Sequence, residues 1–320
     1  AGWSAGGLLR VLQVGRYNSM SAETQRVKVK CQVWKMRSLR SLALLVAPSC
    51  AFRMSAPLPL RKVAMASTSA SGAAPEQFCS IVPYFTVADW AAAEPGLAEC
   101  VAKTKTEEGC LFYGFTRSGD KLHCREAYVD GAATAAHLAN VGGTLGAMLE
   151  SGAAKLDSIE IHGPAEELAK TKEAADPLGA VYFETDADGF KYIRPGAESA
   201  KGFCSIIPYF TVADWEAAEP GLAECVAKTK TEEGCLFYGF TRSGDKLHCR
   251  EAYVDGAATA AHLANVGGTL GAMLESGAAK LDSIEIHGPA EELAKTKEAA
   301  DPLGAVYFET DADGFSKFMV

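Results

Sequence analysis

A histidine lies on the apolar side of an alanine-rich segment that the chain contains twice. The stretch EEGCLFYGFTRSGDKLHCREAYVDGAATAAHL covers residues 107–138 and is repeated letter for letter over residues 232–263. Imidazole titrates near neutral pH, so His137 and its copy His262 are the residues best suited to accept a proton from a substrate. The alternative is a hydrogen-bonded core histidine with no chemical role, because His137 falls on the apolar stripe of the helix expected here.

The segment before this helix carries an acid, a phenol and an arginine at alternating positions. Successive side chains of a strand point to opposite faces, so Glu126 and Tyr128 share one face, whereas His123 and Arg125 share the other. Glu126 and Tyr128 would form a buried acid–phenol pair, with the pKa of the carboxyl raised by burial, or Glu126 would join a structural ion pair. Arg125 or His123 would hold an oxyanion or simply be solvated. The pattern does not tell which face points inward.

Aromatic residues on the preceding strand complete the set of candidates. They would line a cavity for an aromatic molecule or pack in the core. His162, next to a Gly-Pro pair at a strand end, is expected at the surface. The candidate catalytic residues are His137, His262, Glu126, Glu251, Arg125 and Arg250, and the candidate substrate-binding residues are Tyr113, Tyr128, Tyr238, Tyr253, Phe115 and Phe240.

No motif predicts a metal site. Each repeat has four cysteines without the C-x-x-C spacing of zinc or redox sites, so small buried thiols are expected, although Cys110 and Cys124 lie on strands that should pair. The segment ETDADGF resembles the start of a calcium loop. It has Lys191 and Pro195 where that loop needs an apolar residue and a glutamate.

The elements that must position these residues alternate as strand, helix, strand, strand, helix, strand, helix, strand. Asp89 is a plausible helix cap, and Pro95 predicts that the first helix runs from Pro95 to about Glu107. Residues 118–120, Ser-Gly-Asp, predict a hairpin. Asp130 precedes the second helix, which the pair at 142–143, Gly-Gly, should weaken or bend. This order predicts an α+β fold with helices on one face of a mostly antiparallel sheet, whose other face needs a cover.

The whole unit is repeated. Residues 78–190 align with 203–315 at a period of 125 residues, with two differences, Val82 against Ile207 and Ala91 against Glu216. A period this long indicates two domains, since solenoid units repeat every 20 to 50 residues or so. We expect a leader at 1–75, one domain at 76–190, a linker at 191–202 and a second domain at 203–320. Each residue of the first repeat has its copy 125 positions later.

Charge divides the leader from the rest of the chain. Residues 1–75 contain 11 Lys and Arg against one acid, a balance of +10, and the remainder has 20 against 39, a balance of −19. An acidic body argues against nucleic-acid binding. MRSLRSLALLVAPSCAF, which begins at Met36, has the layout of a signal peptide, and the acid-free segment after it resembles a transit peptide. We expect delivery to the plastid stroma with no membrane segment in the mature protein; an ordinary disordered tail is the alternative.

The repeated motifs resemble the antibiotic biosynthesis monooxygenase domain. The resemblance rests on Glu108-Gly109-Cys110, on the Glu-Ala-Tyr-Val-Asp run at 126–130, and on Ala136-His137-Leu138, and it covers essentially all of each repeat. It implies two tandem ferredoxin-like domains packed as an intramolecular dimeric α/β barrel. Tyr128 stands where the family often has Trp, and the Trp and Asn of the haem-degrading relatives have no counterpart on the second helix and first strand, which disfavours that branch.

The resemblance also implies a chemistry. Oxygenases of this family use no metal, flavin or haem and act on electron-rich phenols, anthrones or quinols with O₂. We therefore expect a cofactor-independent monooxygenase for a quinol or phenolic molecule, with the two repeats paired and a further homo-oligomer open. The alternatives are a non-catalytic protein that binds an apolar ligand or acts in stress, and a precursor cleaved in the linker. A convergent base and cation in the cavity would separate the first two.

Overall fold

The computed structural model describes residues 77–185 and 203–310. Both ranges belong to the same compact unit. The expected leader and linker lie outside them, as do the residues after 310. None of the helices in the described ranges is long and apolar enough to cross a membrane.

Each repeat contains five strands, three α-helices and a short 3₁₀ turn within the described residues. The first repeat comprises β1 (Cys79–Val87), α1 (Trp90–Thr104), β2 (Cys110–Ser118), β3 (Lys121–Tyr128), α2 (Gly131–Glu150), β4 (Ala154–Gly163), α3 (Ala165–Ala175), η2 (Asp176–Leu178) and β5 (Val181–Thr185). The second comprises β6 (Cys204–Val212), α4 (Trp215–Thr229), β7 (Cys235–Ser243), β8 (Lys246–Tyr253), α5 (Gly256–Glu275), β9 (Ala279–Gly288), α6 (Ala290–Ala300), η3 (Asp301–Leu303) and β10 (Val306–Thr310).

The helix boundaries follow local capping chemistry more than proline position. The side chain of Asp89 accepts a hydrogen bond from Ala92 N, so α1 begins at Trp90 and contains Pro95, against the expected start at Pro95. Pro95 is the sixth residue of α1, so the helix forgoes the hydrogen bond that an amide there would have made to Ala91 O. Asp130 caps α2 in the same way, and α2 continues through Gly142 to Glu150.

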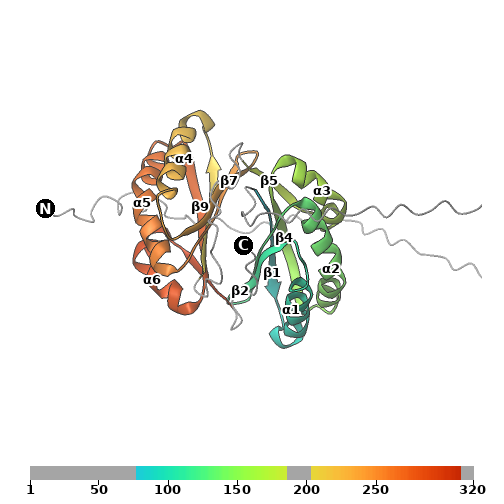
Figure 1. Cartoon of the computed structure of the whole chain (residues 1–320). Coiled ribbons are helices and arrows are strands. Elements are labelled where there is room, and N and C mark those ends of the chain that lie inside the picture. Colours follow the sequence, from blue (N-terminus) through green and yellow to red (C-terminus); the bar gives the residue numbers. More distant parts are fainter. Residues whose placement is uncertain (1–76, 186–202, 311–320) are drawn as a thin grey trace, which may run out of the picture. The chain divides into compact units, whose positions relative to one another are not determined.

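All ten strands close into one barrel in the order β1-β3-β2-β10-β9-β6-β8-β7-β5-β4. The pairs are antiparallel except β4–β5 and β9–β10, which are parallel. Two short seams join the repeats: β10 pairs with β2 through Glu309–Arg117 and Thr310–Thr116, and β5 pairs with β7 through the equivalent residues. Closure leaves no unpaired sheet edge among the strands of residues 77–185 and 203–310. The fold is thus α+β, and its six helices lie outside the strands (Figure 1).

The two faces of the sheet have different partners. Leu122, Cys124 and Tyr128 of β3 pack in a core with helix residues such as Leu97 and Val141. Because side chains alternate along a strand, His123, Arg125 and Ala127 of β3 point into the barrel. One layer of that interior is an apolar cluster drawn from both repeats: Phe78, Phe112, Ala127, Phe203, Leu236, Phe237 and Ala252.

Candidate active site in the barrel interior

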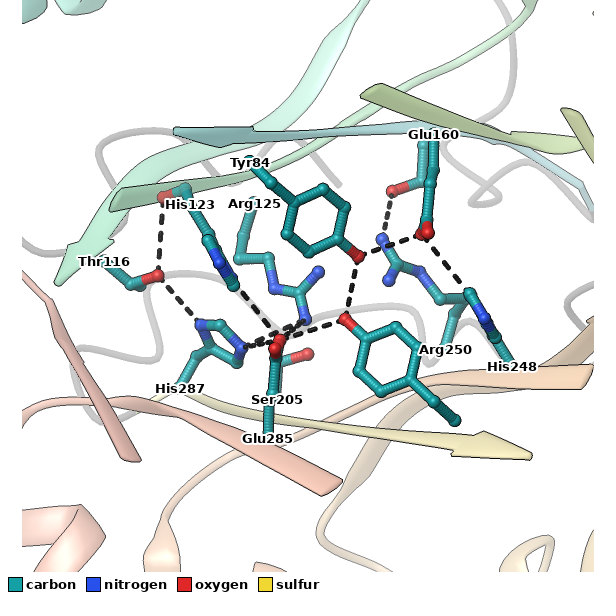
Figure 2. A network of polar contacts seen from close by, with 12 residues as sticks. Tyr84, Thr116, His123, Arg125, Glu160, Ser205, His248, Arg250, Glu285 and His287 are labelled. Carbon is teal, nitrogen blue, oxygen red and sulfur yellow. Dashed lines mark hydrogen bonds and ion pairs between the residues drawn. The ribbon is translucent and has the colours of Figure 1, made fainter. Parts of the chain in front are cut away.

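A layer of polar side chains crosses the barrel next to the apolar cluster. Figure 2 shows strands of the first repeat contributing residues from one side and strands of the second repeat from the other. The members are Tyr84, Thr116, His123, Arg125, Glu160 and His162 from the first repeat and Tyr209, Thr241, His248, Arg250, Glu285 and His287 from the second. Ser80 and Ser205 lie beside it. It forms two clusters with the same residue types.

The first cluster joins Thr116, His123 and Arg125 to Glu285 and His287 of the other repeat. Arg125 Nη2 donates to His287 Nε2 at 3.1 Å and lies 3.9 Å from Glu285 Oε2. His123 Nδ1 lies 3.4 Å from the same carboxylate oxygen. Thr116 Oγ1 is 2.8 Å from His287 Nδ1. Neither repeat contains this cluster alone.

The second cluster joins Thr241, His248 and Arg250 to Glu160 and His162. His162 Nε2 and His248 Nδ1 lie 3.3 Å and 3.4 Å from Glu160 Oε2, and His162 Nδ1 lies 2.9 Å from Thr241 Oγ1. The arginine differs from its copy, because Arg250 Nη2 donates to Ser80 Oγ at 3.4 Å. The equivalent arginines therefore take two different positions. Arg125 contacts His287, whereas Arg250 points to Ser80.

Two tyrosines link the clusters at the centre of the layer. The hydroxyls of Tyr84 and Tyr209 are 2.8 Å apart, and each also contacts a glutamate, Tyr84 to Glu160 and Tyr209 to Glu285, at 2.9 Å (Figure 2). The two tyrosine hydroxyls have two protons to donate and take part in three contacts. The layer is thus one connected network across the barrel.

Burial sets the ionisation of this network. Desolvation lowers the pKa of His123 and His162, with Arg250 adding to the effect on His162, so both imidazoles are neutral near pH 7. Burial would raise the pKa of Glu160, but hydrogen bonding by His162 and His248 lowers it below its usual range. Burial and then Arg125 lower the pKa of Arg250. Two carboxylates and two guanidiniums leave the layer near electrical neutrality.

Several buried donors face the interior without an acceptor among the described residues. They are Arg125 Nε and Nη1 and Arg250 Nη1. Arg125 and Arg250 are only 2% and 4% exposed. An unpaired buried polar group costs about 1–3 kcal/mol, and more when it is charged. Guanidinium can only donate, so these atoms suit a ligand that presents oxygen acceptors or negative charge.

The predicted base, His137, lies on the other side of the sheet. Its Nδ1 is 2.9 Å from Glu107 Oε2 and its Nε2 is 3.0 Å from Glu126 Oε2, and Tyr128 OH donates to Glu126. Burial alone would lower the pKa of His137, but the Glu126 and Glu107 carboxylates raise it to about 9. His137 is therefore a cation near pH 7, between a helix and the sheet. The acid–phenol pair exists, with the histidine as its third member.

The structure thus divides the predicted site residues by sheet face. His137, Glu126, Tyr128, Tyr113 and Phe115 all lie on the helix side, where Tyr113 and Phe115 belong to the hydrophobic core. Their copies His262, Glu251, Tyr253, Tyr238 and Phe240 lie equivalently. Arg125 and Arg250 are the members of the predicted set that point into the barrel.

Sequence reasoning missed most of the interior layer. His162, expected at the surface, is fully buried, because β4 is flanked by β1 and β5 and its side chain points inward. Glu160 and Tyr84 were not singled out. A usable signal was present: Glu160 and His162 are two residues apart on a strand, as are His123 and Arg125, which places each pair on one face. The eight described cysteines are buried free thiols.

Comparisons with known proteins add limited information. No family model matches the chain, and no curated protein matches it. The chain is 33% identical to MupZ from Pseudomonas fluorescens over 34% of this chain and 91% of that one, with a TM-score of 0.32. A provisionally assigned monooxygenase from Fusobacterium nucleatum subsp. nucleatum matches at 13% identity over 66% and 90% of the two chains, with a TM-score of 0.45. An anthrone oxidase-like protein matches at 11% identity over 76% and 92%, with a TM-score of 0.33. Because each TM-score lies below 0.5, these likenesses leave the activity to be inferred from the barrel interior itself.

Proposed function

We propose that the protein is a monooxygenase that oxidises a phenolic or quinol molecule with O₂, without a cofactor, inside the barrel. The observation that carries the proposal is the convergence of a neutral base and a cation on the interior face of one strand, His123 with Arg125, and their copies His248 with Arg250. A protein that only stores an apolar ligand has no need of that pair. Replacing buried charges by apolar residues is often neutral or stabilising, so a buried charged layer favours a chemical role.

The two residues have complementary tasks. His123 is 5% exposed and stacks against Phe308 of the other repeat at 4.2 Å, which fixes the ring. Its neutral imidazole accepts the phenolic proton, and Glu285, 3.4 Å from Nδ1, stabilises the imidazolium that forms. Arg125 then offers Nε and Nη1 to the phenolate oxygen. The apolar cluster next along the strand, beginning with Ala127, suits the aromatic ring.

The reaction balances without an external reductant. The phenolate transfers an electron to O₂, and recombination forms a carbon–oxygen bond at the activated ring position. Loss of water then leaves a quinone. One oxygen atom enters the product, the other leaves as water, and the substrate supplies all the electrons. The dry interior protects the reactive anion from side reactions.

The tandem arrangement follows from the same proposal. Each repeat would be one ferredoxin-like half of a dimeric α/β barrel, joined here in a single chain. The seams β2–β10 and β5–β7 bring Thr116 and Thr241 against histidines of the opposite repeat.

The test is oxygen uptake by the purified chain in EDTA with a panel of quinols and anthrone-like phenols. The key variant is Arg125→Met/Arg250→Met, since methionine fills a similar volume and should preserve folding. We expect kcat/KM to fall by at least about 100-fold, as for loss of an oxyanion donor. The matched control is Arg117→Met/Arg242→Met, which alters arginines that lie over Trp90 and Trp215. Equal rates in both variants would contradict the proposal, and ligand binding without turnover would favour the binding protein.

A further inference from the structure

The three polar side chains Glu160, His162 and His248 have the composition of a transition-metal site. Their ligand atoms all lie within 4.8 Å of one another, and so do those of Glu285, His287 and His123. Two imidazoles and a carboxylate suit Zn²⁺, Co²⁺ or Fe²⁺ and suit Mg²⁺ or Ca²⁺ poorly. Neither the cysteines nor any sequence motif pointed to this site, because its residues come from strands of both repeats.

The hydrogen bonds of the first cluster determine which histidine atom carries a lone pair. Arg125 Nη2 contacts His287 Nε2 at 3.1 Å, and a guanidinium can only donate, so Nε2 is the acceptor. The proton is then on Nδ1, which donates to Thr116 Oγ1 at 2.8 Å. The threonine hydroxyl in turn donates to His123 O at 3.4 Å. A guanidinium thus lies where the imidazole lone pair and the carboxylate of Glu285 meet.

The second cluster has the same partners but a different cation position. His162 Nδ1 contacts Thr241 Oγ1 at 2.9 Å, and Thr241 Oγ1 donates to His248 O at 3.4 Å, so in the tautomer of His287 the Nδ1 proton of His162 has an acceptor. In that tautomer the Nε2 lone pair lies 3.3 Å from Glu160 Oε2, a contact that the other tautomer makes as an Nε2–H···O hydrogen bond, and His248 Nδ1 lies 3.4 Å from the same oxygen. Three electron-rich atoms converge, while Arg250 reaches to Ser80 instead.

The two distances to Glu160 Oε2 match those within a coordination sphere. Two ligand atoms on one ion, with bonds of about 2.0–2.2 Å, lie about 3.0–3.5 Å apart. The supporting contacts also match, because a ligating histidine usually donates its other ring proton to an acceptor, and Thr241 Oγ1 lies 2.9 Å from His162 Nδ1 in that position. Tyr84 OH donates to Glu160 Oε2 at 2.9 Å and orients the carboxylate.

We propose that Glu160, His162 and His248 bind a divalent transition ion of the zinc and cobalt class, and that the symmetric cluster binds a second ion when Arg125 moves away. Arginine and metal ion occupy alternative positions in the same cluster. Since His248 is also the proposed base, the ion competes with the substrate proton and should inhibit oxygen uptake. Metal binding itself does not depend on the proposed function, and its readouts below involve no turnover.

The experiment titrates the full chain, freed of metal with EDTA and dialysed, with Co²⁺. We expect a saturable visible absorption spectrum of Co²⁺ with nitrogen and oxygen ligands, strong binding of the first equivalent and weaker binding of the second. Zn²⁺ should abolish the spectrum, whereas excess Mg²⁺ should not. His162→Gln/His287→Gln, which removes one ligand from each cluster, should weaken binding by at least about 100-fold.

Two further variants make the result decisive. His137→Gln/His262→Gln removes two buried histidines from the helix side and should leave the titration unchanged. Arg125→Met should strengthen binding of the second equivalent, a gain that misfolding cannot produce. A folded wild-type chain with no saturable Co²⁺ spectrum would overturn the proposal. So would an unchanged titration in folded His162→Gln/His287→Gln, which would place the ion elsewhere.

Discussion

His137 is clamped between two carboxylates, and this arrangement makes it a structural cation. Both ring nitrogens contact a glutamate, Glu107 on one side and Glu126 on the other. The Tyr128 hydroxyl donates to Glu126, and Asn140 donates to Glu107 at 2.7 Å. Removing one partner of a buried ion pair usually costs about 3–5 kcal/mol, because the remaining charge stays buried. The residue that the sequence favours as a base is therefore better suited to hold α2 on the sheet.

This clamp predicts a pH dependence of stability. The pKa of His137 is raised from 6.5 to about 9, so its stabilising contribution is complete below pH 6.5 and is lost as the pH rises through about 9. Each of His137 and His262 should contribute on the order of 3 kcal/mol in that window. Urea denaturation at several pH values between 6 and 10 checks this. His137→Gln/His262→Gln should be less stable at neutral pH and should show a flatter dependence; parallel curves would disprove the cationic clamp.

Strand alternation limits what the residues alone could predict. It predicts that Glu126 and Tyr128 face one side of the sheet and that His123 and Arg125 face the other. In the structure the first pair faces the helices and the second faces the barrel interior. The choice of the inward face depends on which face the helices cover, and this is a property of the assembled sheet. His162 was misplaced for the same reason: a Gly-Pro pair at the end of a strand indicates a turn but says nothing about where the side chain directly before it points.

At the scale of elements, local signals predicted where most helices and strands lie. Aspartate caps, the Gly119 turn with φ of 63° and alternating strand residues all act within a few positions. The predicted start of α1 at Pro95 was wrong, because the Asp89 cap starts the helix at Trp90 despite the hydrogen bond that Pro95 cannot make. The closure of the sheet could not be derived locally, since β2–β10 and β5–β7 pair strands far apart in the chain through two residue pairs each.

Two glycines of α2 provide a test of how this helix is held. A Cβ on Gly131 would lie 2.0 Å from the carbonyl oxygen of Glu167 in α3, whereas a Cβ on Gly142 would meet nothing within 4 Å. Gly131→Ala should therefore destabilise the fold by about 1–3 kcal/mol through overpacking. Gly142→Ala should stabilise it by about 0.5–1 kcal/mol through helix propensity. Urea midpoints of the two variants should move in opposite directions; a shift of the same sign would show that α2 and α3 do not pack this closely.

At the scale of the whole molecule, the barrel exchanges halves of its two sites between repeats. The first cluster takes His123 from the first repeat and His287 from the second. The second cluster takes His248 from the second repeat and His162 from the first. Duplication within one chain thus yields two sites with the same residue types, neither of which a single repeat could assemble alone.

Pairs of substitutions can reveal this exchange directly. His123→Gln/His162→Gln changes one repeat but alters both clusters, whereas His123→Gln/His287→Gln changes both repeats but alters one cluster. We expect the first variant to lose oxygen uptake and Co²⁺ binding at both sites. The second should keep about half of the uptake and one intact metal site, because Glu160, His162 and His248 are all unchanged. If each repeat carried its own complete site, the outcomes would be reversed. The two variants contain the same number of histidine changes within the same layer, so general damage to the barrel would affect both alike and cannot imitate the expected difference.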